Sequence, residues 1–144
     1  MTAARIAMFG LLLLGTACSN NTATTPTTTT TTTTNTTPTI SEPFAGTVQV
    51  GGAVFYSFNI AVSGTVNVTL NSVSGAGVPA TVQLGLGIGT PAGTDCSTTS
   101  ALTAASGTAP QLTGTFGPGL FCVRVYDVGN LFGPAAFSVT IAHY

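Results

Sequence analysis

The sequence predicts an all-β fold, an antiparallel β-sandwich of about seven to eight strands. Three observations lead to this prediction. Apolar and polar residues alternate over most segments after residue 41, which is the period of a half-buried strand. Turn-forming residues, mainly Gly, Pro and Ser, interrupt these segments about every eight to twelve residues. No segment after residue 17 repeats its apolar residues at the helical spacing of about 3.6.

The chain has the length of a single domain and carries almost no charge. Its 144 residues include 2 Lys or Arg, 3 Asp or Glu and 1 His, for a formal net charge of −1. The charged positions are Arg5, Glu42, Asp95, Arg124 and Asp127. Because nucleic-acid binding needs clustered Lys and Arg to neutralise phosphates, this composition excludes nucleic acid as a partner.

Residues 1–17 are predicted to be a secretory signal peptide. Arg5 supplies a positive charge, residues 6–14 are almost continuously apolar, and residues 15–17 are small. The apolar stretch is too short to cross a bilayer as a helix, which needs about 20 apolar residues.

The segment Leu14-Gly15-Thr16-Ala17-Cys18 resembles the lipobox of bacterial lipoproteins. The resemblance implies that Cys18 becomes the first residue of the exported protein and carries acyl chains, palmitate among them, that anchor it to a membrane. Ser19, where an Asp would signal inner-membrane retention, is compatible with the outer membrane. The alternative is cleavage after Ala17 by an ordinary signal peptidase, which would release a secreted or periplasmic soluble protein.

Residues 18–41 are predicted to be a disordered tether. They are mostly Thr, Asn and Pro and include an unbroken threonine run, Thr27–Thr34. With so little apolar surface to bury, the segment cannot offset the entropy lost on ordering. Glycosylation of this Thr/Pro stretch is left open, because only composition supports it.

The first two segments of the domain, which spans residues 42–144, are predicted to form a hairpin. Phe44–Val50 and Ala53–Val62 flank Gly51-Gly52, which can supply the positive φ of a two-residue turn. Thr65–Leu70 follows the Ser63-Gly64 turn as a third strand. The alternation predicts that seven residues of these strands face the core: Val54, Tyr56, Phe58, Ile60, Val66, Val68 and Leu70.

The middle of the domain is predicted to contain one strand between two loops. Ser74–Pro79 and the polar segment Thr90–Ser106 are the loops, and Ala80–Gly89 is the strand. Its core face is formed by alternate apolar residues: Val82, Leu84, Leu86 and Ile88. The opposite face carries three glycines, Gly85, Gly87 and Gly89, and therefore admits the close approach of another backbone, a loop or a ligand.

Three further strands complete the predicted domain. Gln111–Phe116 and Ala136–His143 enclose a strand within Gly117–Asp127, which begins at the Gly117-Pro118-Gly119 turn. This middle strand is predicted to be central, with Phe121, Val123 and Val125 facing the core and Leu120, Cys122, Arg124 and Tyr126 facing outward.

Cys96 and Cys122 are predicted to form a disulfide. Once Cys18 is set aside, they are an even pair in an oxidising compartment. The bond would tie the Thr90–Ser106 loop to the central strand and stabilise the fold by roughly 3–4 kcal/mol. Two free thiols are the alternative, and zinc is disfavoured because two Cys with one distant His are a poor ligand set.

The sequence predicts no catalytic residues, no cofactor and no metal site. Nucleophilic catalysis needs a nucleophile, a base and an orienter, but His143 is the only histidine and no Gly-x-Ser-x-Gly motif is present. Glu42 lies at the edge of the tether, so a carboxylate pair for glycoside hydrolysis could come only from Asp95 and Asp127. Asp127 is instead expected to form a surface ion pair with Arg124. A calcium site at Asp127 and Asn130 is a remaining alternative.

Five segments are similar to bacterial pre-peptidase C-terminal domains: Phe44–Val48, Phe55–Phe58, Gly64–Leu70, Gly117–Tyr126 and Ala136–Ile141. The resemblance covers most of residues 44–141 and lies in core and turn positions. It implies a jelly-roll-like β-sandwich of the kind appended to secreted proteases and other exported enzymes, without catalysis of its own. The chain departs from the family in having no peptidase and few acidic residues, so calcium-linked and collagen-binding roles are not carried over.

These observations predict a lipid-anchored cell-envelope β-sandwich with a non-catalytic binding or structural role. The alternative is an accessory protein that assists a separately encoded exported hydrolase. The expected partners are the membrane, through the lipid, and a protein or glycan at the cell surface. Arg124, Tyr126 and Asp127 are the candidate contacts for that second partner.

Overall fold

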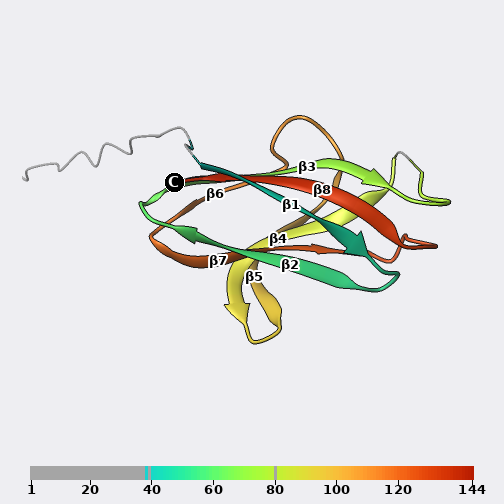
Figure 1. Ribbon diagram of the computed structural model, residues 1–144, viewed down its shortest axis with the longest axis horizontal. Coiled ribbons are helices and arrows are strands. Elements are labelled where there is room, and N and C mark those ends of the chain that lie inside the picture. Colours follow the sequence, from blue (N-terminus) through green and yellow to red (C-terminus); the bar gives the residue numbers. More distant parts are fainter. Residues whose placement is uncertain (1–37, 39, 80) are drawn as a thin grey trace, which may run out of the picture. The chain divides into compact units, whose positions relative to one another are not determined.

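The computed structural model describes residue 38, residues 40–79 and residues 81–144. The predicted signal peptide, Cys18 and most of the predicted tether lie outside the described residues. The described part contains eight strands and no helix (Figure 1). The strands are β1 (Ile40–Val48), β2 (Ala53–Ile60), β3 (Gly64–Ser74), β4 (Gln83–Ala92), β5 (Asp95–Ala105), β6 (Leu112–Phe116), β7 (Gly119–Tyr126) and β8 (Ala135–His143).

The strand order is that of a jelly roll. Sheet A has the order β1-β8-β3-β6 and sheet B the order β2-β7-β4-β5, and all neighbours are antiparallel. Along the chain, β4 and β5 are the innermost pair. The pairs β3–β6, β2–β7 and β1–β8 follow outward and alternate between the sheets. The predicted all-β sandwich is therefore confirmed, with eight strands, and β7 is an interior strand of sheet B as expected.

The core lies between the two sheets and consists of the inward faces that alternation predicts. Its fully buried residues include Val66, Val68 and Leu70 of β3, Leu84, Leu86 and Ile88 of β4, Val123 and Val125 of β7, and Val139 and Ile141 of β8. Burying each such side chain contributes roughly 1.5–3 kcal/mol to the free energy of folding. Because side chains alternate across a strand, the residues between these core positions form the outer surface of each sheet.

The predicted hairpin at Gly51-Gly52 is wrong. β1 pairs with β8 and β2 pairs with β7, so the Gln49–Gly52 turn connects strands of opposite sheets. Gly51 does have positive φ, 68°, and the N–H of Gly52 donates to the Gln49 carbonyl at 2.8 Å. The glycine pair specifies a chain reversal, but only the whole set of pairings decides which sheet each strand joins.

The predicted Thr90–Ser106 loop is also wrong, because most of it is strand. β4 continues to Ala92, and β5 runs back along it as the edge strand of sheet B. Side chains of Ser97–Ala101 are exposed on both faces of β5, so no apolar alternation marks the strand. Threonine nevertheless favours the extended backbone, and the hairpin with β4 supplies the pairing.

The glycine face of β4 is covered by neighbouring groups, as its flatness suggested. The Tyr126 ring lies over Gly85, the Thr98 side chain lies over Gly87, and the backbone of Ser97 lies over Gly89. A register shift between Ile88 and Gly89 marks the point where the β4–β5 pairing becomes irregular. These close approaches bring the start of β5 over β4 and next to the outer face of β7.

Candidate functional site

Two of the three predicted partner contacts, Arg124 and Tyr126, lie on what we call the β7 outer face, which consists of Leu120, Cys122, Arg124 and Tyr126. The third, Asp127, follows the end of β7. The residues of the β7 outer face alternate with the core residues of β7 and therefore point away from sheet A. Leu120 is 57% exposed, whereas Cys122 is fully buried under the start of β5. Phe55 of β2 is the cross-strand partner of Arg124 and extends this face by one more partly exposed aromatic ring.

The disulfide between Cys96 and Cys122 is confirmed, with an S–S distance of 2.04 Å and a Cα–Cα distance of 5.9 Å. Cys96 lies on β5 and Cys122 on β7, with β4 between these strands in the sheet. The backbone of β5 can come close to β4 here because Gly89, the cross-strand neighbour of Cys122, has no side chain, and a Cβ there would meet the backbone of Ser97 and Thr98. The disulfide thus fastens the β4–β5 hairpin onto the β7 outer face.

Arg124 forms its ion pair with Asp95 rather than with Asp127, so the predicted Arg124–Asp127 pair is wrong. The Arg124 Nε lies 3.4 Å from the Asp95 Oδ1, and the two side chains are 32% and 58% exposed. At this exposure the pair is worth less than about 1 kcal/mol. The guanidinium carbon also lies 5.4 Å from the centre of the Tyr126 ring, in a cation–π contact. Sequence spacing suggested Asp127, but the β4–β5 hairpin brings Asp95 closer.

Asp127 organises two loops at the end of β7. Its Oδ2 accepts the N–H of Gly51 at 2.8 Å, and its Oδ1 accepts the N–H groups of Gly129, Asn130 and Leu131 at 2.8, 3.1 and 3.3 Å. The hydrogen bond from Gly51 and those from the three following residues outweigh partial desolvation and lower the pKa of Asp127. Asp127 therefore ties the β1–β2 turn to the β7–β8 loop, and its oxygens are already engaged by backbone donors.

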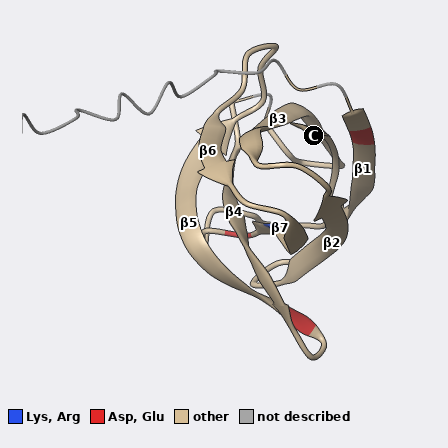
Figure 2. Cartoon of the chain, turned by 90° about the vertical axis from the view of Figure 1, so that its left-hand side faces the viewer, with Lys and Arg blue, Asp and Glu red and all other residues tan. Residues whose placement is uncertain are grey.

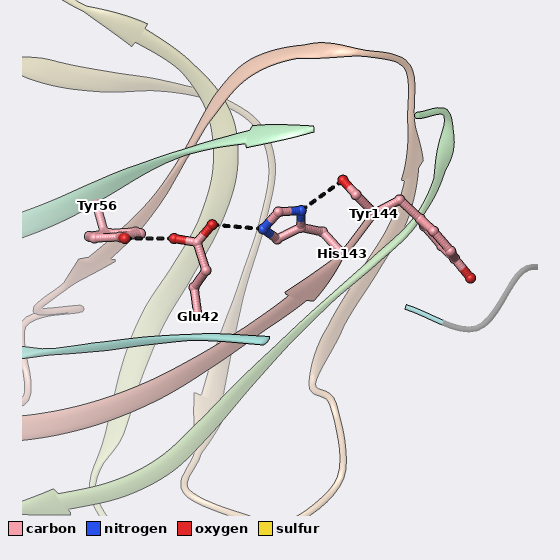
Figure 3. Close-up of polar contacts among 4 residues, drawn as sticks. All are labelled: Glu42, Tyr56, His143 and Tyr144. Carbon is pink, nitrogen blue, oxygen red and sulfur yellow. Dashed lines mark hydrogen bonds and ion pairs between the residues drawn. The ribbon is translucent and has the colours of Figure 1, made fainter. Parts of the chain in front are cut away.

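A second cluster, which sequence reasoning missed, consists of Glu42, Tyr56 and His143 (Figure 3). We call it the Glu42–His143 cluster. Glu42 Oε1 accepts a hydrogen bond from His143 Nε2 at 2.9 Å, and Glu42 Oε2 accepts one from the Tyr56 hydroxyl at 2.6 Å. The three side chains come from β8, β1 and β2, so the cluster joins sheet A to sheet B. The 101-residue separation of Glu42 and His143 hid their contact from local pattern analysis.

His143 faces hydrogen-bond acceptors on both sides of its ring. Nε2 faces the Glu42 carboxylate, and Nδ1 lies 2.9 Å from the carbonyl oxygen of Tyr144. Neither oxygen can donate, so both contacts are hydrogen bonds only when both ring nitrogens carry a proton. The side chain is 1% exposed, and the Phe58 ring lies 5.0 Å from it, centre to centre. The His143 ring is therefore buried, with one nitrogen facing the Glu42 carboxylate and the other facing a backbone oxygen.

The electrostatics of Glu42 and Tyr56 agree with an ionised carboxylate. Partial burial raises the pKa of Glu42, but the hydrogen bonds from Tyr56 and His143 together with the charge of His143 outweigh it, so the pKa lies below its ordinary value. The hydrogen bond to Glu42, its negative charge and desolvation raise the pKa of Tyr56. Tyr56 is therefore a neutral donor to the ionised Glu42 carboxylate near neutral pH.

One sequence signal could have revealed this cluster. His143 continues the inward series Phe137, Val139 and Ile141 of the last strand, so it occupies a core position. A buried histidine needs a polar partner. Glu42 likewise falls two residues before Phe44 on the inward face of β1. Alternation extended to the strand ends would have placed both side chains between the sheets.

The acidic residues of the domain are dispersed, as Figure 2 shows. No group of three or more His, Cys, Asp and Glu side chains could hold a metal ion within the described residues. Asp95 accepts the N–H of Cys96 at 2.7 Å as well as pairing with Arg124. Each of the three carboxylates in the domain thus has protein partners of its own.

No protein-family model matches the chain, and no curated protein matches it either. Within the described part of the sequence, no helix is long and apolar enough to cross a membrane.

Proposed function

We propose that this protein is a lipid-anchored module of the bacterial cell envelope with a non-catalytic binding role. In this proposal residues 1–17 direct export, Cys18 carries the lipid, and residues 19–39 link the lipid to the jelly roll. The last two residues of the predicted tether, 40 and 41, are the start of β1. The domain resembles pre-peptidase C-terminal domains, and the jelly-roll strand order agrees with the fold that this resemblance implies. The outer membrane is the expected destination, because residue 19 is Ser rather than Asp.

The observation that carries the proposal is the disulfide. Cys96 and Cys122 bond to each other, and the chain has 3 cysteines, so Cys18 has no cysteine partner within the chain. Structural disulfides persist in oxidising compartments, which supports export. An exposed thiol at the start of an exported protein would be reactive, whereas an acylated one forms an anchor. The pairing of the other two cysteines therefore supports the lipid-anchor role that the lipobox-like context suggests for Cys18.

The β7 outer face is the proposed partner-binding surface. Exposed Leu120, the Arg124–Tyr126 contact and Phe55 combine apolar, aromatic and cationic groups on one face of sheet B. The disulfide and the ion pair to Asp95 hold β5 against this face and preorganise it, which reduces the entropy lost on binding. Engagement of Glu42, Asp95 and Asp127 in protein contacts favours binding over hydrolysis as the role of the module.

Replacing Cys18 with Ala tests the anchor. In a bacterial host fed labelled palmitate, the wild-type chain should incorporate label and partition into the detergent phase. The C18A variant should incorporate none and move to the aqueous phase, because stable anchoring needs the acyl chains. The L120A variant, altered only on the β7 outer face, serves as the control and should be labelled like wild type. Equal labelling and partitioning of C18A and wild type would contradict the proposal.

A further inference from the structure

The strand that enters the domain from the predicted tether is held at its start mainly by one side chain. β1 is an edge strand whose only partner in sheet A is β8. Its first buried side chain is Phe44, and residues 40–43 are exposed except for partly buried Glu42. The second half of β1 is fixed by Phe44 and Val48 in the core, whereas the first half depends on backbone pairing and on the contacts of Glu42.

Those contacts depend on the ionised form of Glu42. The Glu42 carboxylate accepts from both Tyr56 and His143, and a protonated acid could not accept from both in the same way. Protonation of Glu42 would also remove the negative charge that the His143 ring, 1% exposed, faces. The polar groups of the cluster would then be buried with weaker hydrogen bonds, which is costly, so they would gain from contact with water. Lifting the first residues of β1 gives them that contact.

We propose that the Glu42–His143 cluster is an acid-sensitive clasp, which holds the first four residues of β1 on β8 near neutral pH and releases them in acid. Release of Ile40–Pro43 lengthens the linker in front of the domain while Phe44 and Val48 keep the rest of β1 in the core. The clasp is a property of the domain and does not require lipidation of Cys18.

The direction of the pH effect follows from the Glu42 carboxyl. Its pKa lies below the ordinary value of 4.5, so the clasp contributes its full stability above pH 4.5. That contribution is lost as the pH falls below 4.5 and through the folded-state pKa. The clasp therefore stabilises the start of β1 near neutral pH, and acid releases residues 40–43.

Few other titratable groups contact the cluster. From β2, Tyr56 donates to Glu42 and stays neutral because its pKa is raised. From β8 and the residue after it, the facing groups are His143 itself and the backbone oxygen of Tyr144, the last residue of the sequence. Among the remaining charged residues of the described part, Asp95 and Arg124 pair with each other and Asp127 binds loop amides. The response of β1 should therefore follow Glu42.

Amide hydrogen exchange resolved by residue tests the clasp on the full chain. We compare protection factors of those amides among residues 40–42 that donate to β8 with those of core amides, such as Val68 and Val139, between about pH 7 and about pH 3.5. The β1 amides should lose protection about tenfold or more in acid while the core amides keep theirs. Unchanged β1 protection, or simultaneous loss of protection in all strands, would overturn the proposal.

Three variants make the test specific. Glu42→Gln should show low β1 protection already near neutral pH, with no further loss in acid. Asp95→Asn, the same carboxyl-to-amide change on β5, should respond like wild type. Tyr56→Phe keeps the carboxylate but removes one hydrogen bond that lowers its pKa, so release should begin at a higher pH than in wild type. Tyr56→Phe with the wild-type release pH would refute the clasp even if Glu42→Gln failed to fold.

Discussion

Removing the disulfide by replacing both Cys96 and Cys122 with Ala should lower the free energy of unfolding by about 3.5 kcal/mol, according to the chain-entropy relation for a loop of this size. The two cysteines are 26 residues apart, so the bond restricts a long stretch of the unfolded chain. It also fastens the β4–β5 hairpin to β7 in the folded state. Alanine is chosen because Cys122 is fully buried, and a serine hydroxyl there would add a desolvation cost.

Urea unfolding of the oxidised and reduced wild-type chain provides the control for this prediction. Reduction removes the bond but keeps both sulfur atoms, so reduced wild type and the double variant should show similar loss of stability. The hairpin residues 90–105 should also lose hydrogen-exchange protection before the core of sheet A does. An unchanged urea midpoint after complete reduction would show that the bond contributes little to the fold.

Replacing Gly89 with Ala should lower the free energy of unfolding by at least about 2 kcal/mol, because β5 has no room to give way. A Cβ at this position would overlap the carbonyl oxygen of Ser97 and approach the Thr98 Cα to 2.6 Å. These atoms belong to a backbone, and the Cys96–Cys122 bond holds that backbone in place. The measurement is again urea unfolding, combined with an assay for free thiols to learn whether the disulfide still forms.

Gly117→Ala is the matched control for Gly89→Ala. A Cβ at Gly117 would have only the Ser63 Oγ nearby, at 3.8 Å. Its stability should stay the same or rise by up to about 1 kcal/mol, because alanine reduces the entropy of the unfolded chain. Equal effects of the two substitutions would mean that the close approach of β5 to Gly89 is not what makes glycine necessary there.

Sequence alone predicts the interior of this fold well, and β7 shows why. One face of β7 packs in the core and excludes water, so apolar residues occupy every second position. In the structure the residues on this face are Phe121, Val123 and Val125, and those on the opposite face include Cys122 and Arg124, as predicted. The bond from Cys122 to Cys96 was expected from the number of cysteines and from the oxidising compartment that the predicted signal peptide implies. The first inference depends on the alternation of apolar residues and the second on the number of cysteines, and both can be read from a single sequence.

Edges and distant contacts were harder to predict. β5 has little apolar alternation because it is an edge strand with exposed faces, so its Ser- and Thr-rich sequence resembles a loop. The turn at Gly51-Gly52 is marked locally, but the choice of sheet for β1 and β2 depends on β7 and β8, far along the chain. The contact of Glu42 with His143 depends on that same pairing, in which Glu42 lies opposite Ile141.

Mass spectrometry of the protein purified from bacterial membranes tests the central proposal most directly. The measurement identifies the N-terminal residue and its modification in the wild-type chain. The proposal predicts that the protein begins at Cys18 and that its N-terminal peptide carries the mass of attached acyl chains. An N-terminal peptide that begins at Cys18 without a lipid, or one that still contains residues from 1–17, would contradict it.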